Sequence, residues 1–413
     1  MLTEANAKLA RLYPGDPIGR QPVHTFIGAA DTFTSDAAER VGRQALDTLN
    51  TFAVTPQAFA KVIGLPAGYP GLAETVRARV VDKLTREPVE DYRLDFEDGY
   101  GTRSDMEEDG HAASAAREVA TGMEAGTLPP FIGIRIKPLS PELHARSLRT
   151  LDIFVATLVK TARRLPASFA VTATKVMTPV HVSVLAERCS ALERKLRLKR
   201  NAIQLELMIE TPQAILAPDG TVGVQALVKA GGGRVRGAHF GVYDYTALCG
   251  ITAAWQHPRH LACDVARELM RIALAQTGVM LSDGSSNLLP IPPHVHTAWK
   301  QHFDDVTHSL VNGYYQGWDL HSGHLPTRYA AVYAFYLSAR PAATARLSNF
   351  FTKAAKAGAA FDDAATGQAL INFFNRGLTS GAITLDEAMQ TGLTESELKS
   401  GSFVKILAAR RKM

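Results

Sequence analysis

The feature that most constrains the fold is a regular alternation of short apolar segments with longer stretches of helical periodicity. Eight segments with the character of β-strands follow one another, at residues 22–30, 91–99, 131–139, 169–177, 203–212, 237–246, 279–286 and 313–322. Strands that alternate with helices are typical of parallel βαβ units. Eight such units predict the α/β class and a (β/α)8 TIM barrel. A doubly wound open sheet is the alternative, although no GxGxxG motif follows the first segment, as is typical of a dinucleotide-binding sheet.

The same pattern indicates how the chain is divided. We predict a barrel over residues 1–324, with an insertion near residues 51–90 between the first two strands. Residues 325–413 have helical patterning, which predicts an all-helical C-terminal region. Its paired phenylalanines, Phe350-Phe351 and Phe373-Phe374, are too apolar for a solvated tail. We expect these helices to pack over the barrel mouth, of their own subunit or of a neighbour, and to make the protein a homo-oligomer.

Composition argues against several classes of protein. The chain has 413 residues, of which 46% are hydrophobic and 21% charged, as in ordinary globular proteins. No apolar run approaches the roughly 20 residues that span a bilayer, and the start of the chain lacks the apolar core of a signal peptide. The three cysteines have neither metal-site nor disulfide spacing. We therefore expect a cytoplasmic protein with no membrane partner.

The charge balance gives no indication of nucleic-acid binding. The formal net charge of +5 is small for a chain of this length. The densest basic run, Glu193–Arg200, is typical of the last turn of a solvated helix. No groove-reading or base-stacking pattern accompanies it. We expect no nucleic-acid partner, and a small anionic substrate suits the balance of charges.

Charged residues recur on one side of the strand-like segments. Strand side chains alternate between two faces, and in a barrel one of these faces points into the lumen. In the fifth segment the apolar residues occupy one face, which leaves Glu206 and Glu210 on the lumen side. The same pattern assigns further charged residues to the lumen or to strand ends: Arg93, Asp95, Glu97, Arg135, Lys137, Lys175 and Asp244. Their density rises toward the carboxyl ends of the strands, where barrel enzymes carry their active sites.

Structural and functional explanations of this charge are both open. A buried charge costs on the order of several kcal/mol unless it is paired or bound to a metal. For Arg93, Asp95 and Glu206, a structural ion network explains the pattern as well as a functional site does. Glu210 and Asp244 each end a strand before a turn or a helix, and this position favours function.

Several of these segments resemble the motifs of a known family. The run Asp95-Phe96-Glu97-Asp98, followed by Ala116-Arg117, resembles the second-strand signature of the citrate lyase β-subunit/malyl-CoA lyase group within the HpcH/HpaI aldolase superfamily. The matching segments that follow, in order, are GIRIK, TKV, LMIETPQAI, FGVYDYTALCGI and GWDLHSGHLP. The resemblance covers about residues 20–330, and Lys137 replaces an asparagine that is usual in the group.

The resemblance implies a function and a set of site residues. It implies a Mg²⁺-dependent carbon–carbon lyase or aldolase, with Mn²⁺ as the alternative ion, acting through the enolate of a 2-oxo acid or an acyl-CoA thioester. Glu210 and Asp244 would ligate the metal, and Arg135 would bind the carboxylate or enolate oxygen of the substrate. Glu97 and Asp98 would help to form the shell around the metal and the substrate. Lys175 and His321 would be further catalytic candidates.

Three other functions are open alongside this one. A Schiff-base aldolase would use Lys175 or Lys137 as an amine nucleophile with a lowered pKa. An enolpyruvate-handling phosphotransfer enzyme would use a similar barrel, although no Gly-rich phosphate loop is present. A non-catalytic binding protein is the third. The histidines are scattered along the chain and form no HExxH motif, so the sequence does not predict zinc.

Overall fold

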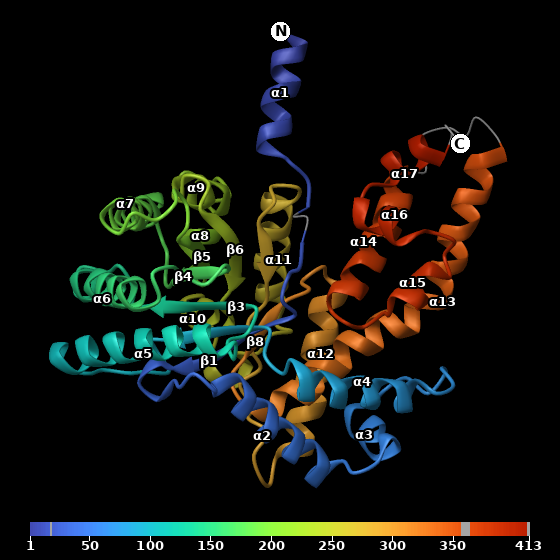
Figure 1. Cartoon of the computed structure of the whole chain (residues 1–413), viewed down its shortest axis with the longest axis horizontal. Helices are drawn as coiled ribbons and strands as arrows, with labels where there is room; N and C mark the ends of the chain where they lie inside the picture. The colour runs from blue at the N-terminus through green and yellow to red at the C-terminus, as the bar shows by residue number, and fades with distance from the viewer. Residues whose placement is uncertain (17–18, 357–363, 411–413) are drawn as a thin grey trace.

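The chain forms a barrel of eight parallel strands surrounded by helices (Figure 1). The computed structural model describes residues 1–16, 19–356 and 364–410. Neighbouring strands follow the order β7-β6-β5-β4-β3-β2-β1-β8, and a parallel bridge between Ser282 and Gln316 brings β7 beside the start of β8. The predicted (β/α)8 barrel is therefore confirmed, and the open doubly wound sheet is wrong.

All eight strand-like segments contain a strand. The bounds are β1 (His24–Ala29), β2 (Asp91–Asp95), β3 (Phe131–Ile136), β4 (Phe169–Ala173), β5 (Gln204–Ile209), β6 (Val235–Phe240), β7 (Met280–Ser282) and β8 (Gly317–Asp319). Apolar side chains of one parity, such as Leu205, Leu207 and Ile209 in β5, are buried against the outer helices. Burial of this apolar face is the main favourable term that holds helices onto the sheet.

The helices between the strands form the outer layer. They are α2 (Ala37–Phe52), α3 (Pro56–Ile63), α4 (Leu72–Arg86), α5 (Asp105–Ala125), α6 (His144–Ala162), α7 (Pro179–Lys195), α8 (Pro212–Ile215), α9 (Val224–Ala230), α10 (Val242–Leu248), α11 (Leu261–Leu274) and α12 (Val295–Val311), with short 3₁₀ turns η1 (Ala30–Thr32), η2 (Ala253–Trp255) and η3 (Ser322–His324). In Figure 1, α5, α6 and α7 lie along one side of the barrel, and the C-terminal helices lie along the other. An N-terminal helix, α1 (Leu2–Leu12), has no buried residue and projects from the body.

Residues 51–90 add two helices, α3 and α4, between β1 and β2. Thr55 caps α3 by accepting a hydrogen bond from the N–H of Ala58 over 3.1 Å, and Pro56 occupies the first helical position. Phe59 of α3 is buried and meets the ring of Trp299 in α12 edge-on, with centroids 5.6 Å apart. This segment therefore packs on the outside of the barrel, away from the lumen.

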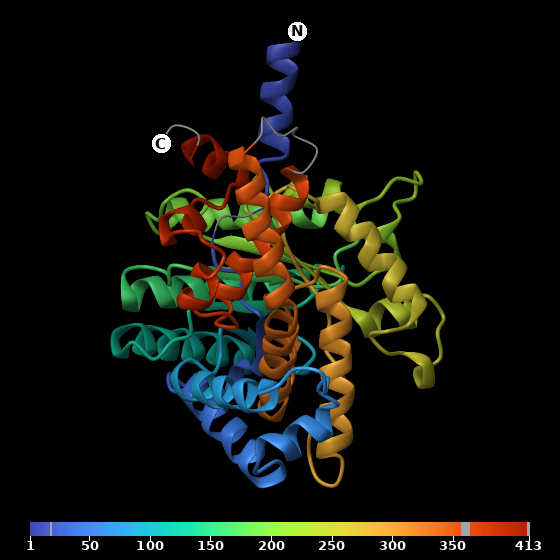
Figure 2. The same ribbon diagram turned by 90° about the vertical axis from the view of Figure 1, so that its right-hand side faces the viewer.

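The C-terminal region begins with a single long helix, α13 (Leu325–Lys356), of 32 residues. A helix of that length extends for about 48 Å, so it runs back along the barrel from the carboxyl end of β8 and continues past it. Four shorter helices pack around its far half: α14 (Ala364–Thr379), α15 (Leu385–Met389), α16 (Glu395–Ser400) and α17 (Phe403–Arg410) (Figure 2). Residues 357–363 and 411–413 of the predicted region lie outside the described residues.

The C-terminal helices lie toward the amino ends of the strands. Arg376 pairs with Asp16 at 3.3 Å and covers the ring of Tyr315 at 4.0 Å, and these two partners precede β1 and β8. Glu387 pairs with Arg79 of α4 at 2.8 Å. The expectation that these helices close the mouth of their own barrel is wrong, because α13 carries them to the opposite end. Whether they cover the mouth of a neighbouring subunit stays a prediction.

A paired ion network fills the middle of the lumen. Arg93 contacts Asp91 at 2.7 Å and Glu206 at 2.9 Å, and Glu206 also contacts Arg236 at 2.8 Å and His239 at 3.1 Å. Burial opposes the ionised form of Glu206, but the two arginines outweigh it and hold its pKa well below the usual range. The lumen position of Arg93 and Glu206 agrees with the strand alternation, and their mutual pairing favours the structural explanation.

Two further observations concern the chain as a whole. In the part of the chain that the structure describes, no helix combines the length and apolar character needed to cross a bilayer. Cys189, Cys249 and Cys263 carry free thiols, and Cys189 and Cys263 are buried.

Candidate active site

Charged side chains converge where four strands end. Glu97 and Asp98 follow β2, Glu210 follows β5, and Asp244 lies in the first turn of α10, directly after β6. Lys175 follows β4 and lies among them. Parallel strands bring their carboxyl ends to one rim of the barrel, so residues far apart in the sequence meet there.

Lys175 is the cation at the centre of this group. Its Nζ forms an ion pair with Glu97, and lies 3.4 Å from Asp98 and 3.7 Å from Asp244. Its backbone N–H donates to Oε1 of Glu210 over 2.6 Å, from a left-handed conformation with φ of 49°. Burial lowers the pKa of Lys175, but Glu97, Glu210 and Asp244 outweigh that effect and raise the pKa overall.

The charge of Glu210 is only partly compensated by its neighbours. It is 3% exposed, and burial, followed by the negative charge of Asp244, raises its pKa from 4.5 to about 7. A glycine gives its side chain room: a Cβ on Gly241 would lie 2.4 Å from Cβ of Glu210 and 2.5 Å from Oε2. Only glycine lacks that atom, so the local sequence FGVYD suits the position of Glu210.

Arg135 is held rigidly beside this group. Its Nε and one terminal nitrogen donate to the two oxygens of Asp95, each over 2.6 Å, and its other terminal nitrogen lies 3.1 Å from Glu97. The guanidinium also faces the ring of Trp318 at 5.5 Å. A bidentate arginine–carboxylate pair fixes both position and orientation, so Arg135 presents its remaining N–H groups in one direction.

The donor set suits a hard divalent cation. Four carboxylates, those of Glu97, Asp98, Glu210 and Asp244, lie at this rim, and Lys175 is the cation that contacts three of them. Mg²⁺ takes oxygen ligands and is usually held by one or two carboxylates while retaining waters. A surplus of carboxylates with a buried acid whose pKa is near 7 is therefore compatible with a Mg²⁺ ion at Glu210 and Asp244.

Comparison with known proteins places the chain in a family. Residues 2–406 match the family model described as a domain of unknown function, DUF6986. The chain belongs to the DUF6986 family. No curated protein matches its sequence.

Solved structures share the fold of this DUF6986 chain. A citrate lyase from Burkholderia xenovorans LB400 superposes with a TM-score of 0.59 at 16% identity, over 91% of this chain and 97% of its own. A malate synthase from Haloferax volcanii gives a TM-score of 0.51 at 14% identity, over 76% of each chain. At these identities the likeness concerns the fold alone, and it confirms the barrel fold that the predicted resemblance implied.

Two predicted residues of the DUF6986 chain make no described contact with the four carboxylates of the acidic group. His321 caps the 3₁₀ turn η3 by accepting a hydrogen bond from the N–H of Gly323 over 3.0 Å, and none of its described contacts is to the residues around Lys175. Lys137 was expected in the lumen, which is wrong. The regular alternation stops with β3 at residue 136, and the Lys137 ammonium instead pairs with Glu108 of α5 at 2.8 Å.

A second group of possible metal ligands lies outside the lumen, between β8 and the helices. His302, Asp319 and His324 are buried, with ligand atoms within 4.8 Å of one another. Arg328, however, contacts Asp319 at 2.9 Å, and the rings of His302 and His324 stack with centroids 4.4 Å apart. A cation would be repelled by the guanidinium, and stacked rings do not point their nitrogens at one ion. This group therefore acts as a buried structural network.

The sequence did not single out some residues that shape the site. Gly241 accommodates Glu210, and its only signal is a glycine directly after a strand. Glu108 lies on a helix whose charges look ordinary in the sequence, yet it is 1% exposed.

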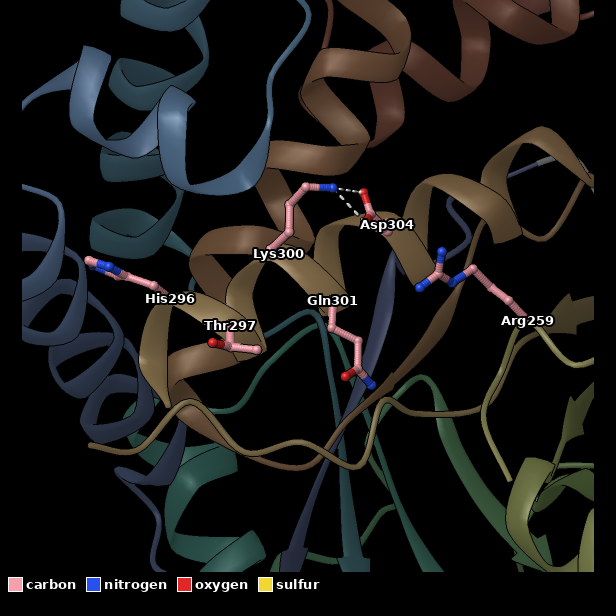
Figure 3. A pocket seen from close by; sticks show the side chains of 6 residues that line it. All are labelled: Arg259, His296, Thr297, Lys300, Gln301 and Asp304. Atoms are coloured by element: carbon pink, nitrogen blue, oxygen red, sulfur yellow. Dashed lines mark hydrogen bonds and ion pairs between the residues drawn. The ribbon is translucent and has the colours of Figure 1, made fainter. Parts of the chain in front are cut away.

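A cavity of about 500 Å³ on the outer side of α12 is unrelated to the acidic group (Figure 3); its lining residues are Arg259, His296, Thr297, Lys300, Gln301 and Asp304.

Proposed function

We propose that this protein is a Mg²⁺-dependent carbon–carbon lyase or aldolase that acts through the enolate of a small anionic 2-oxo acid or of an acyl-CoA thioester, with Mn²⁺ as the alternative ion. The observation that carries the proposal is the meeting of four carboxylates around one lysine at the carboxyl rim of the barrel. So many acids destabilise the folded protein unless a cation joins them. The barrel it shares with a citrate lyase is consistent with this chemistry, although fold alone does not establish function.

Each residue of the site has a separate proposed role. Glu210 and Asp244 would hold the cation, which when bound supplies Lewis-acid polarisation of the 2-oxo group and offsets the charge of the enolate. Arg135 has five N–H donors, of which Asp95 and Glu97 take three. The remaining donors would bind the carboxylate or enolate oxygen of the substrate. Because Asp95 fixes the guanidinium, it would need little rearrangement as negative charge develops.

A Schiff-base aldolase is the second candidate, and the position of Lys175 opposes it. A nucleophilic lysine must lose its proton, which a neighbourhood of cations or apolar groups promotes. Lys175 instead contacts three carboxylates, and its pKa is raised. No observation favours phosphotransfer or a purely binding role.

We further propose that the protein is a cytoplasmic homo-oligomer. Analytical ultracentrifugation tests the oligomeric state.

Calorimetric titration of Mg²⁺ in the presence of oxalate, a 2-oxo acid enolate analogue, tests the metal assignment. Glu210→Gln and Asp244→Asn should lose binding while their circular dichroism spectra stay native. Glu39→Gln is the matched control, because Glu39 is an exposed acid on α2, far in the sequence from the rim. Binding in both site variants that equals the wild-type affinity would contradict the assignment.

A further inference from the structure

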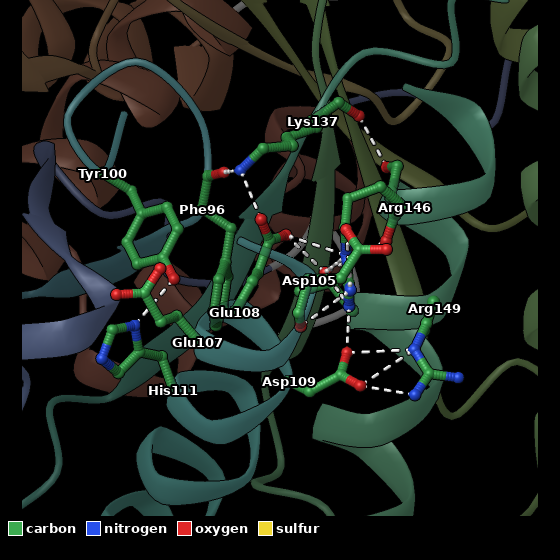
Figure 4. A network of polar contacts seen from close by, with 12 residues as sticks. Phe96, Tyr100, Asp105, Glu107, Glu108, Asp109, His111, Lys137, Arg146 and Arg149 are labelled. Atoms are coloured by element: carbon green, nitrogen blue, oxygen red, sulfur yellow. Dashed lines mark hydrogen bonds and ion pairs between the residues drawn. The ribbon is translucent and has the colours of Figure 1, made fainter. Parts of the chain in front are cut away.

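Lys137 occupies a position from which its ammonium reaches the back of the acidic group. It lies one residue beyond β3, and its Nζ points toward the turn that joins β2 to α5 (Figure 4). Nζ donates to the carbonyl oxygen of Phe96 over 2.6 Å and lies 2.8 Å from Oε2 of Glu108. It also faces the ring of Tyr100, at 4.8 Å from the centroid. An ammonium has three donors, and each of these contacts takes one direction around Lys137.

These contacts enclose a segment that we call the acidic turn, residues 96–100, which carries Glu97 and Asp98. One ammonium touches both ends of the turn, at Phe96 and at Tyr100. The side chain of Lys137 is 11% exposed, so solvent weakens its ion pair little. Lys137 therefore restrains the backbone on either side of the two carboxylates.

The opposite side of the acidic turn is restrained by Asp95. Its Oδ1 accepts a hydrogen bond from the N–H of Glu97 over 2.9 Å, and its Oδ2 accepts one from the N–H of Gly99 over 2.7 Å. The turn is therefore held from the lumen by a carboxylate and from the outside by an ammonium. Loss of either group would release one side of the same short segment.

Glu108 anchors Lys137 and is itself anchored. Its side chain is 1% exposed, and Oγ1 of Thr150 donates to its Oε1 over 2.6 Å. Nε of Arg146 lies 3.5 Å from the same carboxylate. Oγ of Ser147 donates to the carbonyl oxygen of Lys137 over 2.6 Å, so α6 fixes the backbone of the lysine as well. The network joins β2, β3, α5 and α6 behind the acidic turn.

We infer that Lys137 is a positioning residue, which holds Glu97 and Asp98 in place through the carbonyl of Phe96 and the carboxylate of Glu108. The structural part of this inference is independent of the reaction, whereas its effect on metal binding rests on the proposed function. Glu97 and Asp98 lie outside the proposed ligand pair, Glu210 and Asp244, and loss of groups that support a metal site from outside its ligands lowers metal affinity by about 10–100-fold. Without the ammonium, the Phe96 carbonyl loses its donor and Glu108 stays buried with a weaker counter-charge.

Hydrogen–deuterium exchange of the peptide that contains the acidic turn, together with Mg²⁺ calorimetry, tests the role. In Lys137→Met the turn should exchange faster, and Mg²⁺ should bind about 10–100-fold more weakly, with an unchanged circular dichroism spectrum. Lys137→Arg keeps a cation and should recover much of both properties. Arg149→Met is the matched control: Arg149 pairs with Asp109 at the same α5–α6 contact, its side chain is 60% exposed, and it should change neither readout.

The outcomes separate this inference from the proposed function. Exchange of the acidic turn in Lys137→Met that equals the wild-type rate would overturn the positioning role. Faster exchange in a protein whose wild-type form binds no Mg²⁺ would support the positioning role and overturn the proposed function. If Lys137→Met does not fold, Glu108→Gln gives the same comparison, because it weakens the lysine's anchor while preserving the shape of the side chain.

Discussion

Replacing Lys175 by methionine should make the stability of this protein depend more strongly on a divalent cation than that of the wild type. In the structure, Nζ of Lys175 pairs with Glu97, and lies 3.4 Å from Asp98 and 3.7 Å from Asp244. Methionine keeps much of the volume of the side chain but removes its charge. The backbone N–H that donates to Glu210 is retained. The variant therefore removes the central cation and leaves the carboxylates in place.

The expected size of the effect follows from burial. Removing one partner of a buried ion pair costs about 3–5 kcal/mol. The side chain of Lys175 is 29% exposed and that of Glu97 is 5% exposed, so solvent screens part of the interaction. We expect the free energy of unfolding in EDTA to fall by about 2 kcal/mol. Mg²⁺ that binds the released carboxylates should restore about 2.7 kcal/mol at roughly 100 times its Kd.

Urea denaturation followed by circular dichroism, in EDTA and in Mg²⁺, measures both quantities. Lys160→Met, at an exposed position on α6, is the matched control and should behave as the wild type in both buffers. The Lys175→Met protein should also bind Mg²⁺ more tightly than the wild type, since the ammonium no longer competes for the carboxylates. A variant that is equally stable in EDTA, or that Mg²⁺ does not stabilise, would refute this reasoning.

Three other predictions test neighbouring parts of the site. Borohydride with pyruvate should leave no adduct on Lys175 or Lys137 by mass spectrometry, because each ammonium is paired with a carboxylate, Lys175 with Glu97 and Lys137 with Glu108; an adduct on either would favour the Schiff-base aldolase. The pKa of Glu210 is raised from 4.5 to about 7, so the folded protein keeps a proton on this carboxyl that the unfolded chain loses. In EDTA, the contribution of Glu210 to the free energy of unfolding should therefore be fully present below about pH 4.5 and lost as the pH rises through 7. Glu210→Gln should flatten this dependence in urea titrations across pH. Gly241→Ala places a Cβ 2.4 Å from Cβ of Glu210, so calorimetry should show weaker Mg²⁺ binding by a folded protein, and an unchanged affinity would oppose the role of Glu210.

The sequence was sufficient to predict the barrel and the lumen side of its strands. Alternation along a strand is a local property, so Glu206 and Arg93 could be assigned to the lumen from the residues beside them. The same logic failed at Lys137, because β3 ends at Ile136 and the next side chain follows the turn of the backbone. A rule of alternation holds only while the backbone stays extended.

Long-range placement could not be predicted from the sequence. The helical pattern after residue 325 gave the type of structure but not the length of α13, and that length carries the later helices to the amino ends of the strands. The meeting of Lys175 with Glu97 and Asp244 likewise depends on how separate strands align at the rim. Strand ends identified these residues as candidates, whereas their distances and the raised pKa of Glu210 required the folded chain.

The central claim is that Glu210 and Asp244 hold a divalent cation at the carboxyl rim of the barrel. A crystal structure of the protein with Mn²⁺ and oxalate tests it most directly, because anomalous scattering locates the ion independently of the protein. Our account predicts one Mn²⁺ peak bonded to carboxylate oxygens of Glu210 and Asp244, with oxalate on the ion. An empty rim, or an ion held only by His302, Asp319 and His324, would contradict it.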